Sequence, residues 1–168
     1  MLKALKNQLV LLAVQEQERF VAEVERRCHP PNAADTAAAL RELIVAMPDL
    51  IAQIRAWAGD PRIPRHEKQL QGFLLTYLYH PTDFLPESNW GLFGYLDDAY
   101  LVGQIYLGTL RTMIDSPSSL PNVKEFEAAV PPWLQSARQV IPAEAAKIDL
   151  LLSELRAGNV GEPERTQD

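Results

Sequence analysis

One stretch near the middle of the chain constrains the fold more than any other, because residues 92–114 are apolar on most sides of a helix. At about 100° per residue, Val102 and Ile105 widen an apolar seam on one side, and Tyr100 and Leu107 widen it on the other. The seam itself consists of Leu92, Leu96, Ala99, Gly103, Tyr106, Leu110 and Met113. A helix with so wide an apolar surface is normally enclosed by other helices. The sequence therefore predicts a buried central helix near residues 92–114.

The remainder of the chain also carries helical rather than strand periodicity. Apolar residues recur three and four positions apart, and no alternating apolar and polar run is long enough for a strand. The 168 residues, of which 47% are hydrophobic, suit one domain with a sizeable core. We therefore predict an all-α, single-domain bundle of about six or seven helices over residues 1–158. The polar tail at residues 159–168 is predicted to be disordered.

Residues 2–28 indicate one long helix. Apolar residues recur along it at helical spacing, and Val14 and Cys28 belong to its later stripe, so Cys28 is expected in the core. Its apolar run is too short to span a bilayer, which needs about 20 residues, and no small-residue cleavage site follows. The lone cysteine excludes an intrachain disulfide and fits a reducing compartment. We therefore expect a cytoplasmic chain without a transmembrane span.

Polar caps, glycine and proline place the next helices. Asp35 or Thr36 is predicted to cap the second helix at its start. Pro48 is predicted to break or kink that helix, and Gly59 to cap its end. A further helix is predicted over residues 66–79.

Prolines also punctuate the last part of the chain. Pro131 and Pro132 are predicted to separate two helical pieces, "VKEFEAAV" and "PPWLQSARQV". Pro142 suits the first turn of the last helix, and Gly158 is predicted to end it. The last helix has a clear apolar face, formed by Ile148, Leu151, Leu152 and Leu155.

The segment "HPTDFLPESNWGLFGYLDDAYLVG", residues 80–103, sets prolines and acids in an ordered spacing. A proline, an aspartate and a second proline with an acid after it are followed by a glycine and a double aspartate. The residues in question are Pro81, Asp83, Pro86, Glu87, Gly94, Asp97 and Asp98. Over about residues 77–110 this pattern resembles the signature of the YkvA-like family, domain of unknown function number 1232. The commonest form of that signature has aspartate in place of Glu87 and another proline before the glycine. The resemblance implies a small helical domain, often bacterial, and brings no established activity.

One interpretation of the motif is a structural helix–loop–helix corner. Pro81 would stop the preceding helix, Asp83 would accept backbone amides and Pro86 would fix a turn. Ser88 or Asn89 would then cap the next helix, and Gly94 would let another helix approach closely.

The two adjacent aspartates are predicted to differ. Asp97 lies on the polar arc of the central helix and is expected to face water. Asp98 lies between Val102 and Ile105 on a mostly apolar side, so it is expected to be buried. A buried carboxylate needs hydrogen-bond donors, and the amides of the corner are the expected ones.

The alternative interpretation of the motif is a divalent-metal site. Magnesium or manganese would take carboxylate oxygens from Asp83, Glu87, Asp97 and Asp98 and could act on a phosphate-containing substrate. Against it, adjacent aspartates point about 100° apart on a helix. The three histidines have no spacing for a shared ion, and no nucleophile with a base is recognisable in the sequence. We therefore assign no catalytic residue and expect no cofactor.

The composition favours a binding or scaffold role without catalysis. The net charge of −6 argues against nucleic-acid binding. Trp57, Trp90 and Trp133 are placed near predicted helix ends or loops, and tyrosines cluster around the motif, as at surfaces that bind a protein partner. Core packing is the other interpretation of these aromatic residues. Homo-oligomerisation and peripheral membrane association through residues 2–14 are further alternatives.

Overall fold

The computed structural model describes residues 1–28, 32–78, 85, 87–113 and 123–158, except for the side chains of Cys28, Glu87 and Ser88. Every regular element within these ranges is a helix. Seven α-helices of 12 residues or more are present there, which confirms the predicted all-α bundle and its helix number. The predictions for Cys28 as a core residue and for the tail at residues 159–168 concern parts of the chain outside this description.

The predicted single helix over residues 2–28 is wrong, because two helices meet at Glu16. The first, α1 (Leu2–Gln15), ends there and the second, α2, covers Gln17–Cys28. Glu16 leaves helical geometry (φ −106°, ψ 16°), and its Oε2 accepts the backbone N–H of Leu92 at 2.7 Å. The break gives each half its own direction, so Leu9 and Phe20 are both buried. Val14, predicted in the apolar stripe, is 72% exposed.

The longest helix is α3 (Ala33–Trp57), and Pro48 lies inside it rather than ending it. Asn32 caps α3, in place of the predicted Asp35 or Thr36, and its side chain accepts the N–H of Asp35 at 3.2 Å. Gly59 does not take the left-handed conformation of a glycine cap. Because α3 packs against α1, α2, α6 and α7, its burial outweighs the roughly 3 kcal/mol that an interior proline costs.

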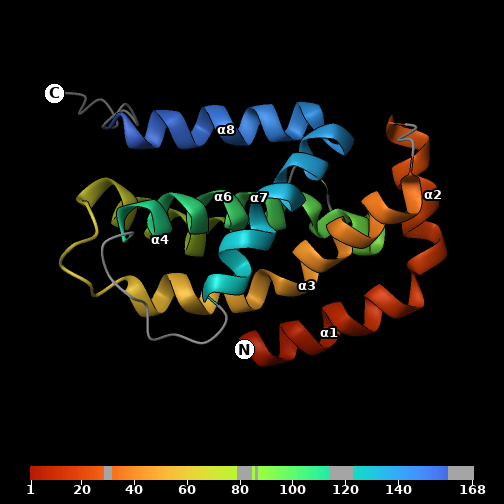
Figure 1. Cartoon of the computed structure of the whole chain (residues 1–168), viewed down its shortest axis with the longest axis horizontal. Helices are drawn as coiled ribbons and strands as arrows, with labels where there is room; N and C mark the ends of the chain where they lie inside the picture. Colours follow the sequence, from red (N-terminus) through yellow and green to blue (C-terminus); the bar gives the residue numbers. More distant parts are fainter. Residues whose placement is uncertain (29–31, 79–84, 86, 114–122, 159–168) are drawn as a thin grey trace, which may run out of the picture.

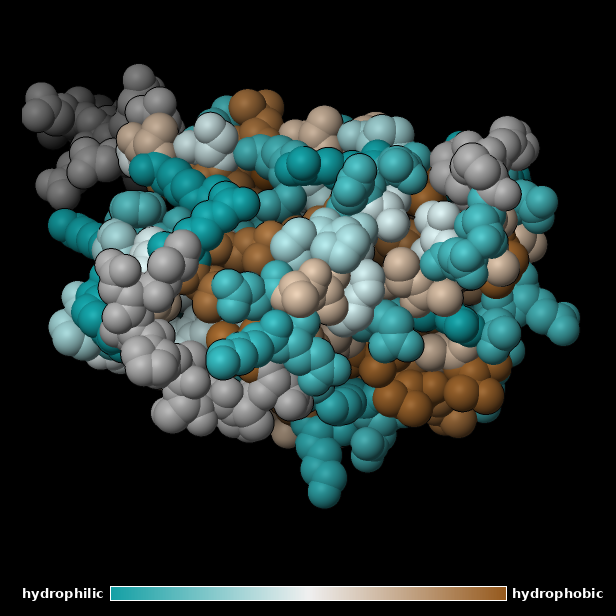
Figure 2. Space-filling model, viewed as in Figure 1, coloured by the Kyte–Doolittle hydropathy of each residue, from teal (hydrophilic) through white to brown (hydrophobic). Residues whose placement is uncertain are grey.

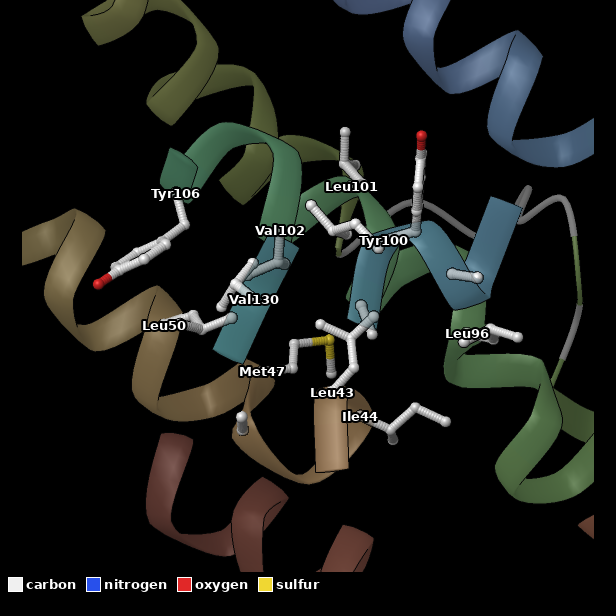
Figure 3. Close-up of a cluster of buried hydrophobic side chains, with 14 of the residues drawn as sticks. Leu43, Ile44, Met47, Leu50, Leu96, Tyr100, Leu101, Val102, Tyr106 and Val130 are labelled. Carbon is white, nitrogen blue, oxygen red and sulfur yellow. The ribbon is translucent and has the colours of Figure 1, made fainter. Parts of the chain in front are cut away.

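The predicted central helix is confirmed as α6 (Leu96–Thr112), which is buried along most of its length. A one-turn helix, α5 (Glu87–Trp90), and a 3-10 segment, η1 (Gly91–Tyr95), lead into it. The residue preceding α6 is Tyr95, and no side chain caps the helix, so neither Ser88 nor Asn89 caps it as predicted. Figure 3 shows how side chains of α3, α6 and α7 meet in the core, among them Leu43, Ile44, Met47, Leu50, Leu101, Val102 and Val130.

The last two helices are α7 (Val123–Val140) and α8 (Pro142–Arg156). Pro131 and Pro132 lie within α7, so the prediction of two separate pieces is wrong. Pro142 opens α8 as predicted, and Gly158 follows its end at φ +72°. Helix α7 packs closely on α6 at Gly103, where a Cβ would lie 2.8 Å from the Leu134 side chain.

Figure 1 shows α8 along one edge of the molecule and α1 along the opposite edge, with α3, α6 and α7 between them. The remaining helix, α4 (Arg65–Tyr77), lies at the end of the bundle far from α2. It packs on α6 and α8. Among the helices described, none is both long enough and apolar enough to cross a membrane.

Candidate binding site

The acidic motif places Asp97 in the interior, so the prediction that it faces water is wrong. Asp97 is fully buried, and its Oδ2 accepts the backbone N–H of Leu85 at 3.2 Å. Leu85 is itself only 3% exposed. Asp97 stands in the first turn of α6. Its position on the polar arc of α6 therefore does not determine its exposure, and one of its contacts is with Leu85, which lies outside the helix.

Asp98 is buried as predicted, with 7% of its surface exposed, and Val102 and Ile105 on the same helix are fully buried. Most of the corner to which Asp98 was predicted to bond lies outside the described residues, so that prediction is not tested. Asp98 also lines a cavity together with Tyr95. The two aspartates therefore face different surroundings, but both lie in the interior.

The rest of the motif is described only in part. Pro81, Asp83 and Pro86 lie outside the described residues, and so does the side chain of Glu87. The predicted four-carboxylate arrangement is therefore not tested. Gly94 is buried in η1. Among the residues whose placement is given, no three His, Cys, Asp or Glu side chains are grouped to hold a metal ion.

An apolar groove runs between α3 and α4. It consists of two cavities of about 240 and 280 Å³, both of which are lined by Ile51, Arg55 and Leu75. The first continues toward Ala58 of α3. The second continues toward the start of α1 at Leu2. We call the two together the α3–α4 groove.

The helical repeat explains which side chains form its walls. On α3, one face carries Met47, Ile51, Ile54 and Ala58, at successive spacings of four, three and four residues. From α4 the wall contains Leu74 and Leu75, and Leu78 follows directly after the end of the helix. Leu75 remains 41% exposed, so the groove is open to a partner at this edge.

A glycine leaves space in the wall contributed by α4. Gly72 lines the cavity of about 240 Å³, and a Cβ added there would meet no atom within 4 Å. The nearby Gln71 is buried and donates from Nε2 to Thr109 Oγ1 of α6 at 3.4 Å. One side of this segment of α4 is therefore fixed to α6 while the other side stays open.

Two cations stand among the apolar walls. Arg55 lies in the last turn of α3 and Lys68 lies on α4, and both line the cavity of about 240 Å³. Neither makes a salt bridge with any of the residues that the structure describes. At the other end of the groove stand Tyr95 and Asp98. The groove therefore offers apolar area together with charge.

Tyr95 lines one end of this groove, but the three tryptophans that the sequence pointed to do not line it. Trp57 is 4% exposed and stacks on Tyr106 at 5.4 Å between ring centroids. Trp90 is half-buried, with the Arg27 guanidinium carbon 5.0 Å from its ring centroid. Trp133 lies near the middle of α7 and not near a helix end. The available signal for the groove was a second apolar face on α4, which Leu75 and Leu78 define three residues apart.

A second polar cluster joins α6, α7 and α8 away from the groove. The buried Tyr100 hydroxyl donates to Asp149 at 2.9 Å and accepts bonds from Gln104 at 2.8 Å and Arg138 at 2.5 Å. Burial raises the pKa of Tyr100, as does its hydrogen bond to Asp149. Arg138 also donates to Asp149 at 3.0 Å. Since these groups satisfy one another, the cluster serves to connect three helices.

Comparison with family models, with curated proteins and with solved structures finds no match for this chain. The YkvA-like resemblance of the motif therefore stays a prediction. The class that the fold defines is an all-α single-domain bundle.

Proposed function

We propose that this protein is a non-enzymatic binding module that takes an amphipathic helix of a partner protein into the α3–α4 groove. The observation that carries the proposal is the pair of joined apolar cavities along α3 and α4, with Leu75 exposed at the edge. Amphipathic helices bind in such grooves by inserting side chains spaced three and four residues apart.

The length of the groove supports a helix as its occupant. Along α3 its wall runs from Met47 to Ala58, which at 1.5 Å per residue is about 16 Å. Three turns of a docked helix have about this length. The groove is open along one side at Leu75, so the polar face of such a helix would stay in water while its apolar face is buried.

The buried acids support a role without catalysis. Asp97 accepts a backbone amide at the corner, and that bond uses its carboxylate for structure. Asp98 lines the groove at the end where α1 and η1 also contribute residues, and a carboxylate there polarises one end of the binding surface. On this proposal the motif positions the groove instead of performing chemistry.

The probe for this proposal is a displayed library of helical peptides of about 12 residues. Leucine is fixed at the first, fourth, fifth and eighth positions, and the remaining positions vary among alanine, glutamine, glutamate and lysine. We expect enrichment of binders on the wild-type protein. The affinity of one labelled binder is then measured by fluorescence anisotropy for the wild type and for two variants.

Leu75→Glu places a charge in the groove and should weaken binding by about tenfold or more, because burying a leucine is worth about 1.5–3 kcal/mol. Leu150→Glu is the matched control, since Leu150 is 61% exposed on α8 and does not line the groove. It should leave the affinity unchanged. Absence of any binder, or equal losses in the two variants, would refute the proposal.

A further inference from the structure

Arg55 and Lys68 are among the described cations that form no ion pair, and both line the same apolar cavity. Six of the described lysines and arginines form ion pairs with described acids, for example Arg156 with Glu67 at 3.0 Å and Arg138 with Asp149 at 3.0 Å. Arg55 and Lys68 form none within the described residues, although the chain carries a net charge of −6. Two unpaired cations thus face one apolar cavity in an acidic protein.

The acids closest in sequence to Lys68 are already engaged. Glu67 has a side chain that is 4% exposed, and it pairs with Arg156. Asp60 accepts hydrogen bonds from the side chain and backbone of Arg62, and these bonds, together with the charges of Arg62 and Lys68, lower its pKa to about 2. Lys68 forms no ion pair with it within the described residues. Neither carboxylate lines the groove. Asp98 lines the other end of the groove, and no described acid lines the cavity of about 240 Å³ that holds both cations. A carboxylate beside both cations would therefore come from the occupant.

Docking of a partner helix would increase the need of Arg55 and Lys68 for an acidic partner. An apolar helix that covers Arg55 and Lys68 would remove part of their hydration without replacing it, which disfavours the complex. A carboxylate on the helix restores a charged partner and strengthens the attraction as water leaves. A lysine at the same place would be repelled by both cations.

We infer that the partner helix is acidic, with one or two carboxylates flanking its leucines at the end that docks beside Arg55 and Lys68. This inference rests on the proposed function and adds the charge of the partner to it. Arg55 and Lys68 then act as specificity-determining residues, while the leucine and isoleucine walls supply most of the affinity.

The peptide library tests the charge directly. Binders selected on the wild type should contain glutamate more often than lysine at the varied positions that flank the leucines. In one such binder, replacing glutamate by glutamine should weaken binding about two- to fivefold for each pair lost, as for partly exposed ion pairs. Arg55→Gln and Lys68→Gln should cause similar losses, and raising the salt concentration should reduce the difference.

A double-mutant cycle identifies which of the two cations, Arg55 or Lys68, pairs with the carboxylate of the peptide. If the carboxylate meets Arg55, then Arg55→Gln weakens the glutamate peptide but leaves the glutamine peptide almost unchanged. Lys124→Gln is the control, because Lys124 is an exposed cation at the start of α7 that does not line the groove. It should affect neither peptide.

The outcomes separate this inference from the proposed function. If no peptide binds, both fail. If peptides bind and Leu75→Glu abolishes binding, but glutamate and lysine are selected equally, only the acidic partner is refuted. Cosedimentation with phosphatidylserine vesicles that is lost in Arg55→Gln would also refute it, because the cations would then recognise lipid phosphates.

Discussion

The substitution Gly91→Ala tests how α1, α2 and η1 are joined. Gly91 has φ +58°, where alanine costs about 1–2 kcal/mol. Its Cβ would collide with the carboxylate of Glu16, which accepts the Leu92 N–H at 2.7 Å. Loss of a hydrogen bond to a charged group costs about 1.5–3 kcal/mol, and the half-buried position of Glu16 favours the lower part of that range. The total is about 2.5–4 kcal/mol, or a Tm lower by about 5–15 °C.

Urea denaturation of four proteins resolves the two contributions. They are the wild type, Gly91→Ala, Glu16→Ala and the double variant. Once Glu16 is truncated, Gly91→Ala should cost only the backbone part, about 1–2 kcal/mol. Gly72→Ala is a control that should change stability in the opposite direction. Gly72 is helical and a Cβ added there would have open space around it, so alanine should raise the free energy of unfolding by up to about 1 kcal/mol. If Gly91→Ala costs the same with and without Glu16, to within about 0.5 kcal/mol, the reasoning is refuted.

Three further predictions concern buried polar groups. Asp97→Asn should destabilise by about 1–3 kcal/mol in urea, and a loss no larger than that of the exposed control Glu154→Gln would contradict its role at the corner. Burial raises the pKa of Tyr106 to about 12, above the usual tyrosine value near 10. As the pH rises, the unfolded chain therefore loses this proton before the folded protein does, and the free energy of unfolding should fall between about pH 10 and pH 12. Tyr106→Phe should reduce that fall, and an unchanged pH profile would count against the burial of this phenol. Arg156→Ala removes the ion pair of the buried Glu67 carboxylate and should lower the free energy of unfolding by about 3 kcal/mol. Glu67→Gln in the same protein should restore a part of this loss, and additive losses in the double variant would disprove the coupling of the pair.

The sequence predicted those features that depend on a helix's own residues. The wide apolar surface of residues 92–114 indicated the buried α6, and Pro142 and Gly158 marked the start and end of α8. These are local signals, because periodicity and capping chemistry act within one element. Other local signals failed: Asn32, and not Asp35 or Thr36, caps α3, and Pro131 and Pro132 lie within α7.

Features that depend on contacts between elements were not predicted. Nothing in residues 2–28 marks Glu16 as a break, since its partner is the backbone of Leu92, 76 residues away. The buried Asp97 accepts a hydrogen bond from Leu85, which lies outside α6 and 12 residues away in the sequence. Pro48 remains inside α3 because packing on several sides outweighs a local cost.

The groove is also a feature that depends on contacts between elements and was not predicted from the sequence. Its existence depends on the separation of α3 and α4, which is set by how each helix packs on α6. Leu75 and Leu78 were visible as apolar residues beside the main face of α4, but their spacing alone is equally consistent with core packing. The outer face of α1 is a second exposed apolar surface, formed by Val10, Leu11 and Val14 and visible as brown atoms along the edge occupied by α1 (Figure 2).

The central claim is that a partner helix binds between α3 and α4, and methyl NMR tests it most directly. The protein is labelled at its isoleucine, leucine and valine methyl groups and titrated with a selected glutamate-containing peptide. We predict that the largest shift changes fall on Ile51, Ile54 and Leu75, while those of Val14 and Leu150 stay small. Shift changes concentrated on the outer face of α1, or an unchanged spectrum at saturating peptide, would contradict the claim.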